Sequence, residues 1–138
     1  MSAPSCSTGW CPLARLYRWV KERLSGKGTD GTVIEGITPP EVASWQERDA
    51  RLIDVREAWE FKSGHIPGAR NVPLSSLSSQ LNGKLKPDGR PVVLICASGA
   101  RSGRAASLLA RHGFDELANL VGGTNAWARQ GLPIRTGR

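Results

Sequence analysis

Cys96 is the side chain of this sequence that is best placed for nucleophilic chemistry. It follows the apolar run PVVLI (91–95), and a short loop separates it from 102–111, where the pattern predicts a helix. A free cysteine with a pKa of about 8.5 is only about 3% thiolate at pH 7. Amide N–H groups at the start of a helix favour an anion and lower the pKa of a nearby thiol. The position therefore predicts an activated thiolate, with an inert buried thiol as the alternative.

The loop that follows Cys96 has a composition suited to holding an anion. Its small side chains would let the backbone curl around a sulfur atom, and its glycine can adopt a positive φ. Its arginine could add a permanent positive charge. We therefore expect a small anionic substrate to bind here. The candidate binding residues are Ala97, Ser98, Gly99, Ala100, Arg101 and Ser102.

Other side chains in the chain could also carry chemistry. Asp54, Arg56 and Glu57 form a charged cluster just after the apolar segment RLIDV (51–55), where a general acid or base role is conceivable. His65, in GHIPGA, is a candidate partner for the cysteine. A thiol that is already ionised needs no base, which weakens that pairing.

Two further cysteines lie near the N-terminus, in the segment CSTGWC. Cys6, Cys11 and Cys96 make an odd count of three, which argues against a disulfide framework. The spacing is not C-x-x-C, and no second pair completes a zinc site. We expect flexible thiols at Cys6 and Cys11 and no metal, with a sulfur-accepting role for these cysteines as the alternative.

Short strands and helices alternate along most of the chain, a pattern that predicts a parallel sheet covered by helices on both faces. The segment PVVLI is the clearest buried strand, because it is continuous, apolar and β-branched. Residues 65–74 are rich in turn formers and predict a crossover. The expected strands are 33–37, 51–55, 91–95, 116–121 and 133–136, and the expected helices are 38–49, 56–64, 75–85, 102–111 and 124–130.

Residues 1–31 are expected to form an extension that precedes a domain at 32–138. Within the extension, the apolar spacing of 13–24 predicts a short amphipathic helix, and SGKGTDG (25–31) predicts a linker. No run approaches the roughly 18 apolar residues of a membrane span, and the N-terminus lacks the apolar centre of a secretory signal. We therefore expect a cytoplasmic protein.

The net charge of +7 favours anionic partners, which include small anions. The basic residues are scattered through the main domain. They form no basic motif interleaved with aromatic residues, which would favour nucleic-acid binding. A solvated basic surface is the favoured interpretation, and no nucleic-acid partner is expected.

Three motifs, in order along the chain, resemble those of the rhodanese family of single-domain sulfurtransferases. CASGARS (96–102) is similar to the active loop of the family. LIDVREAWEFKSGHIPGARNVPL (52–74) resembles its N-terminal signature, and VGGTNAWARQGLPI (121–134) resembles its C-terminal one. The resemblance spans about 37–135. It implies the α/β fold class, as a rhodanese-like three-layer domain with a central parallel sheet flanked by helices.

The resemblance also implies an activity. Cys96 would take a sulfane sulfur from thiosulfate or a related donor, release sulfite, and pass the sulfur from a persulfide to a thiol or cyanide acceptor or to a protein. The amides of 97–102 would cradle the persulfide, and Arg101 would help bind the donor. Asp54 and Arg56 would form a supporting ion pair, and His65 would belong to a structural turn. The resemblance implies no metal and no organic cofactor.

Two other functions stay open. Related phosphatases and arsenate reductases place five residues between cysteine and arginine, whereas four separate Cys96 from Arg101. The shorter ring should hold a sulfur atom better than a tetrahedral phosphate or arsenate. The second alternative is a non-catalytic rhodanese-like module used for binding or regulation. Such modules often lack the cysteine, and its presence here weakens that interpretation.

Overall fold

A computed structural model describes residues 26–27 and 32–137, with side chains from residue 32 onward. The helix expected at 13–24, together with Cys6 and Cys11, lies outside the described residues. Within the described ranges, no helix is both long and apolar enough to cross a membrane.

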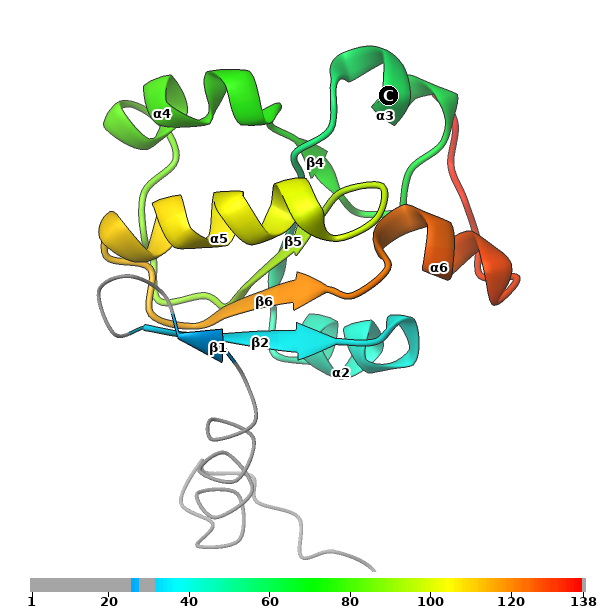
Figure 1. Cartoon of the computed structure of the whole chain (residues 1–138), viewed down its shortest axis with the longest axis horizontal. Helices are drawn as coiled ribbons and strands as arrows, with labels where there is room; N and C mark the ends of the chain where they lie inside the picture. Colours follow the sequence, from blue (N-terminus) through cyan, green and yellow to red (C-terminus); the bar gives the residue numbers. More distant parts are fainter. Residues whose placement is uncertain (1–25, 28–31, 138) are drawn as a thin grey trace, which may run out of the picture.

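A single sheet runs through the middle of the described part of the chain (Figure 1). Its strands are β1 (Gly26–Lys27), β2 (Val33–Ile37), β3 (Arg51–Asp54), β4 (Arg70–Asn71), β5 (Val92–Ile95) and β6 (Leu117–Leu120). They lie in the order β1-β2-β6-β5-β3-β4, and all neighbouring pairs are parallel except β1 with β2. The carboxyl ends of β3, β5 and β6 therefore meet at one edge of the sheet, with β5 between the other two.

Helices cover both faces of the sheet. They are the 3-10 turn η1 (Pro39–Glu41) and the helices α2 (Val42–Glu47), α3 (Ala58–Ser63), α4 (Leu74–Asn82), α5 (Ala100–Arg111) and α6 (Gly123–Arg129). Apolar side chains of α4 and α5 pack together on one face, and those of α2 and α6 pack on the other. The short helix α3 lies beyond the carboxyl ends of the strands (Figure 1).

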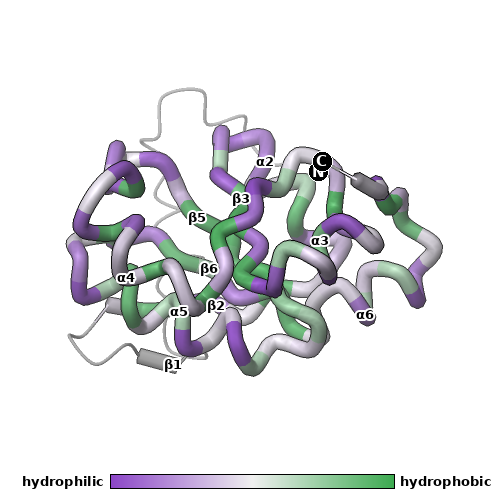
Figure 2. Tube along the Cα trace, turned by 90° about the horizontal axis from the view of Figure 1, so that it is seen from above, coloured by the Kyte–Doolittle hydropathy of each residue, from purple (hydrophilic) through white to green (hydrophobic). Residues whose placement is uncertain are grey.

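Strand β5 shows why its sequence is apolar without interruption. Val92 and Leu94 face the core under α4 and α5, whereas Val93 and Ile95 face the core under α2 and α6. Successive side chains of a strand point to opposite faces, so a strand covered on both faces must be apolar at every position. Figure 2 shows hydrophobic residues along the central strands and hydrophilic residues toward the outer helices and loops.

The α/β fold with a central parallel sheet is confirmed, but four local predictions were wrong. Helix α5 begins at Ala100 and not at Ser102, because Gly99 ends the preceding loop with a φ of 106°. The crossover at 65–74 contains β4, and the linker at 25–31 contains β1. Segments of two residues are too short to show an alternating pattern. The strand expected at 133–136 is reduced to an isolated bridge between His65 and Arg135.

Candidate active site

Cys96 lies at the carboxyl end of β5, at the base of the loop that enters α5. The residue is 1% exposed, and its sulfur faces the loop backbone. The Gly99 N–H donates a hydrogen bond to Cys96 Sγ at 2.9 Å, and the Ser102 hydroxyl lies 3.3 Å from the same atom. The positive φ of Gly99 turns the chain tightly enough for its amide to point back at the sulfur.

Two opposing effects act on the ionisation of this thiol. Burial raises the pKa of Cys96, because a thiolate loses solvation inside the protein. Hydrogen bonds from the Ser102 hydroxyl and from the amides of Ser102, Gly99 and Ser98 lower it, and together they outweigh burial. The net result is a pKa of Cys96 below its ordinary value, so the site favours the nucleophilic thiolate.

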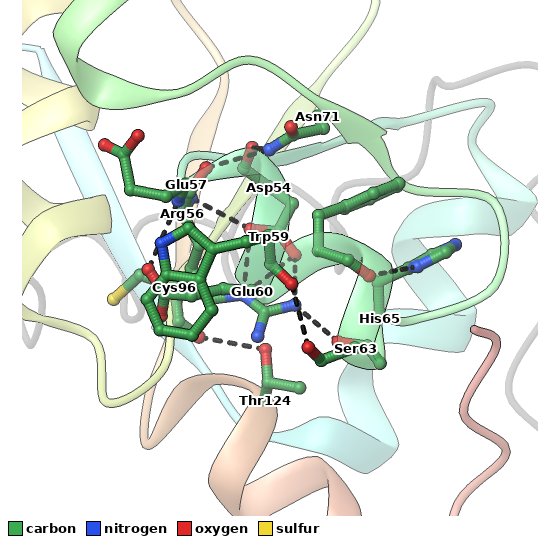
Figure 3. Close-up of polar contacts among 12 residues, drawn as sticks. Asp54, Arg56, Glu57, Trp59, Glu60, Ser63, His65, Asn71, Cys96 and Thr124 are labelled. Carbon is green, nitrogen blue, oxygen red and sulfur yellow. Dashed lines mark hydrogen bonds and ion pairs between the residues drawn. The ribbon is translucent and has the colours of Figure 1, made fainter. Parts of the chain in front are cut away.

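The first turn of α6 holds the other side of the loop. The Thr124 N–H and hydroxyl donate to the Cys96 carbonyl at 2.8 and 3.1 Å, and Figure 3 shows Thr124 beside Cys96. The Asn125 N–H donates to the Ala97 carbonyl at 3.1 Å. In a trans peptide the C=O and the following N–H point in opposite directions. Helix α6 therefore donates hydrogen bonds to the carbonyls of the loop, and the amides of the loop can face inward toward the sulfur.

Gly123 makes this close contact between α6 and the loop possible. A Cβ at this position would lie 2.1 Å from the Cys96 carbonyl oxygen and 2.7 Å from the Ala97 carbonyl carbon. Its φ is +57°, which also favours glycine. Any side chain at this position would push the helix and the loop apart.

Arg101 is turned toward α3 and holds a carboxylate. Its Nη1 and Nη2 donate to the two carboxylate oxygens of Glu60 at 2.6 and 2.9 Å. The hydrogen bond with Arg101 is the main reason that the pKa of Glu60 falls to about 2. Glu60 in turn raises the pKa of Arg101, with a smaller contribution from the Cys96 thiolate. The positive charge is thus beside the site, but its bidentate donors are engaged.

The remaining loop residues differ in accessibility. Ser98 and Ala100 are exposed and Ala97 is half-buried, whereas Ser102 is fully buried. A molecule approaching from solvent therefore meets the exposed part of the loop before it reaches the sulfur.

Asp54 and Arg56 form a buried ion pair after β3. Arg56 Nη2 lies 2.9 Å from Asp54 Oδ2 and also donates to the Gly64 carbonyl at 2.6 Å. The Asn71 side chain donates to the backbone carbonyls of Asp54 and Arg56 at 3.1 and 2.9 Å. These contacts join the chain after β3 to the end of α3 and to β4. Removing one partner of such a pair would leave an uncompensated buried charge.

His65 is not beside the thiol. Its ring stacks on Phe61 at 3.7 Å between centroids, and its Nδ1 lies 2.7 Å from the Phe61 carbonyl. Figure 3 shows it on the far side of the Asp54–Arg56 pair from Cys96. This arrangement does not form a cysteine–histidine dyad. In the described ranges, no group of three or more His, Cys, Asp or Glu side chains is arranged to hold a metal ion.

Several contributors to the site were missed from the sequence. Glu60 lies 41 residues before Arg101, and only the fold reveals that the two residues are partners. Thr124 and Asn119 were likewise not singled out. A usable signal existed for Asn119, because it is a polar residue inside the apolar strand segment LANL.

Comparison with known proteins finds a matching family model and related sequences. A family model described as "Rhodanese-like domain" matches residues 38–130. The protein YqhL of Bacillus subtilis, described as uncharacterized, is 51% identical over 80 residues, which make up 58% of this chain and 62% of that protein. A protein of Allochromatium vinosum named "Sulfurtransferase" is 41% identical over 62% of this chain and 78% of its own length. The chain thus spans a little under two thirds of the Bacillus relative.

Solved structures show the same fold. A rhodanese-related protein from Thermoplasma volcanium superposes with a TM-score of 0.65 at 28% identity, over 72% of this chain and 96% of its own. A protein of unknown function from Rhodopseudomonas palustris, described as a possible tyrosine phosphatase, gives a TM-score of 0.66 at 28% identity, over 74% of this chain and 85% of its own. The relatives thus include one protein named as a sulfurtransferase and one described as a possible phosphatase.

Proposed function

Because this chain belongs to the family of rhodanese-like domains, we propose that it is a sulfurtransferase that carries sulfur on Cys96. The observation that carries the proposal is the arrangement around the sulfur. Cys96 directly follows the central strand β5, and its Sγ accepts a hydrogen bond from the Gly99 amide, with the Ser102 hydroxyl beside it. The relative named "Sulfurtransferase" supports the same reaction class.

The first half-reaction loads the enzyme. The Cys96 thiolate attacks the outer sulfur of thiosulfate, a new S–S bond forms, and the bond between the two thiosulfate sulfurs breaks. Sulfite leaves with the electron pair of the broken bond, and a persulfide anion remains on Cys96. The total charge is the same before and after the step. Inward-facing amides stabilise both the Cys96 thiolate and the persulfide anion, which is the role of a preorganised anion site.

The second half-reaction unloads the enzyme. A nucleophilic acceptor, such as cyanide, a small thiol or a protein thiol, attacks the terminal sulfur of the persulfide. The S–S bond breaks, and its electron pair returns to Cys96 as a thiolate. Two half-reactions of this kind give ping-pong kinetics. A new bond between the acceptor and the transferred sulfur forms from the acceptor's own electron pair, so the step needs no redox cofactor. The cytoplasm stays the predicted compartment.

The residues of 97–102 have different proposed roles in binding. The amides of Ser98, Gly99 and Ser102 lower the pKa of Cys96, and we assign the persulfide cradle to them. Arg101 would bind an anionic donor only by exchanging its contact with Glu60, which now takes both of its terminal nitrogens. Asp54 and Arg56 have a supporting role, because their contacts are with each other and with nearby backbone.

A phosphatase is the second candidate, because a structural relative is described as a possible tyrosine phosphatase. The spacing in this chain disfavours it, since only four residues separate Cys96 from Arg101. A purely binding role is disfavoured by the presence of Cys96 itself and by the lowered pKa of its thiol.

Steady-state kinetics across several sulfur donors test the proposal. The assay compares thiosulfate with glutathione persulfide, uses Cys96→Ser as the control, and measures phosphate-ester hydrolysis in parallel. We expect sulfur transfer with at least one donor, no transfer by Cys96→Ser, and no phosphatase activity. Hydrolysis of phosphate esters that depends on Cys96, without sulfur transfer, would establish the second candidate. No Cys96-dependent turnover in either assay would leave the binding role.

A further inference from the structure

The hydroxyl of Ser102 has more acceptors within reach than it has protons. Its Oγ lies 3.3 Å from Cys96 Sγ, 3.1 Å from the Gly99 carbonyl oxygen and 2.5 Å from Asn119 Oδ1. A serine hydroxyl carries one proton and can donate one full hydrogen bond at a time. Ser102 is 0% exposed, so its hydroxyl is surrounded by these protein groups. The sulfur and the amide oxygen therefore compete for the same proton.

The side chain of Asn119 is oriented by a second contact. Its Nδ2 donates to the Gly99 carbonyl at 3.1 Å, so that Oδ1 is the end that faces Ser102. With the amide reversed, its oxygen would face the Gly99 carbonyl oxygen with no proton between them. Asn119 is half-buried in β6, and a polar side chain at this depth needs such partners. The network thus fixes an acceptor against the Ser102 hydroxyl.

We propose that Asn119 is a positioning residue of the active site, which competes with the Cys96 sulfur for the single proton of the Ser102 hydroxyl. The inference rests on the proposed role of Cys96 as the nucleophile. With a neutral thiol, the Cys96 S–H donates to Ser102 Oγ, and the Ser102 O–H donates to Asn119 Oδ1. When the thiol proton leaves to solvent, the Ser102 O–H turns to the thiolate, and Asn119 Oδ1 loses its donor.

This exchange opposes ionisation of Cys96. Forming the thiolate gains one charge-assisted hydrogen bond from Ser102 but gives up the hydrogen bond between Ser102 and Asn119. Without Asn119, only the sulfur and the Gly99 carbonyl would be left as acceptors for this hydroxyl. Asn119 therefore makes the resting thiol less reactive than the loop would make it without Asn119. When the thiol is neutral, Asn119 Oδ1 accepts the hydrogen bond of the Ser102 hydroxyl.

The charged groups around the loop are not altered by a change at position 119. Arg101 on α5 and Glu60 on α3 face the site and pair with each other. Asp54 at the end of β3 and Arg56 just after it act on this pair through their charges. The contacts from α6 come from backbone amides and the neutral Thr124 side chain. An uncharged substitution of Asn119 thus isolates the hydrogen-bond effect.

A double-mutant cycle tests the proposal. The full chain with Cys6→Ser and Cys11→Ser leaves Cys96 as the single thiol. In it we compare Asn119→Leu, Ser102→Ala and the combination by the rate of Cys96 alkylation as a function of pH. Leucine has the same number of side-chain heavy atoms in the same branched arrangement as asparagine, but no polar atom. The direct effect of losing the Asn119 contact with the Gly99 carbonyl occurs in both backgrounds, so the cycle removes that part of the change.

We expect Asn119→Leu to speed alkylation below the midpoint of the pH profile about three- to tenfold more when Ser102 is present than when it is alanine. Equal effects in the two backgrounds, or a smaller effect with Ser102 present, would overturn the proposal. Asn119→Ala is the second variant if leucine prevents folding, with the same expected outcome. Alkylation needs no sulfur donor, so the result is readable even if the protein proves not to transfer sulfur.

Discussion

At the scale of single residues, the sulfur of Cys96 is governed by the balance between burial and hydrogen bonding. Burial is the larger single effect and opposes the thiolate, whereas several smaller contributions from Ser102, Gly99 and Ser98 favour it. A balance of this kind is sensitive to the loss of one donor. A thiol that is 1% exposed can still have a lowered pKa here, because the hydrogen-bond donors of the loop together outweigh the effect of burial.

Replacing Ser102 with alanine tests this balance. The change removes the side-chain donor to Cys96 and leaves burial in place, so the pKa of Cys96 should rise. At neutral pH less thiolate would be present, and we expect the alkylation rate of Cys96 to fall about tenfold. The whole pH profile of alkylation should shift to higher pH. Ser107→Ala is the matched control, because Ser107 is half-buried on α5 and its hydroxyl contacts the Gly103 carbonyl. An unchanged profile would mean that the hydroxyl does not act on the sulfur.

At the residue scale, only part of the candidate site could be predicted from the sequence. Cys96 and the loop that surrounds it could be predicted, because strand, loop and helix start are adjacent in the chain. Glu60 and Asn119 act through contacts 41 and 17 residues away from their partners. Only the sheet brings these segments together. The pairing of Arg101 with Glu60 could not be predicted, because no local pattern reveals the carboxylate opposite it.

At the scale of elements, α6 is the support that orients the active loop. Gly123→Ala tests this role, because the added Cβ would lie 2.1 Å from the Cys96 carbonyl oxygen. We expect a loss of about 2–5 kcal/mol in the free energy of unfolding, from backbone strain and overpacking, and a lower alkylation rate of Cys96. Denaturant unfolding and alkylation kinetics measure the two effects.

Gly131→Ala is the matched control for Gly123. Its φ of +70° carries a similar backbone strain, but nothing lies within 4 Å of the added Cβ. We expect it to cost about 1–2 kcal/mol and to leave Cys96 reactivity unchanged. If both substitutions destabilise the protein equally and neither changes the alkylation rate of Cys96, the close contact between α6 and the loop does not contribute to the reactivity of Cys96.

Helix α3 contributes the carboxylate that pairs with Arg101, and this pair predicts a pH dependence of stability. The pKa of Glu60 is lowered from 4.5 to about 2 in the folded protein. An acid with a lowered pKa stabilises the fold above its unfolded pKa, and the stabilisation is lost as the pH falls through its folded value. Between pH 4.5 and 2, wild type should therefore lose stability more steeply than Glu60→Gln.

Thermal unfolding across this pH range measures the difference between the two proteins. Glu47→Gln, at an exposed position at the end of α2, removes the same charge away from the loop and should keep the wild-type slope. Parallel slopes for wild type and Glu60→Gln would show that the Arg101 contact does not stabilise the folded state.

The element scale sets a second limit on prediction from sequence. Strands of four or five residues such as β3, β5 and β6 could be found from their apolar runs, and the parallel sheet followed from their alternation with helices. The two-residue strands β1 and β4 could not be found, because their pairing depends on neighbouring strands and not on a local pattern. The start of α5 was displaced because Gly99 ends the loop earlier than expected.

At the scale of the whole molecule, the sheet places a single cysteine of the described residues at the edge where three strand ends meet. Charges of both signs surround it in pairs, as Arg101 with Glu60 and Arg56 with Asp54. The excess of positive charge in the chain therefore acts on anionic donors mainly through the wider field of the molecule and less through a free cation beside the sulfur.

The two N-terminal cysteines belong to this scale, since any part they play would involve a segment outside the described residues. We predict that Cys6→Ser combined with Cys11→Ser keeps the sulfur-transfer rate within about twofold of wild type, because the proposed chemistry needs one thiol. Turnover with thiosulfate and with a persulfide donor measures this. Loss of turnover in the double variant, with Cys96 still reactive toward alkylation, would assign a transfer step to the N-terminal segment.

The most direct test of the account is the mass of the intact protein after incubation with thiosulfate and removal of the excess donor. The Cys6→Ser/Cys11→Ser variant should gain the mass of one sulfur atom, located by peptide mapping on Cys96 and removed again by cyanide. The same treatment should leave a variant with Cys96→Ser unchanged. An unmodified Cys96 under conditions where a known sulfurtransferase is loaded, or the same adduct on the Cys96→Ser variant, would contradict the account.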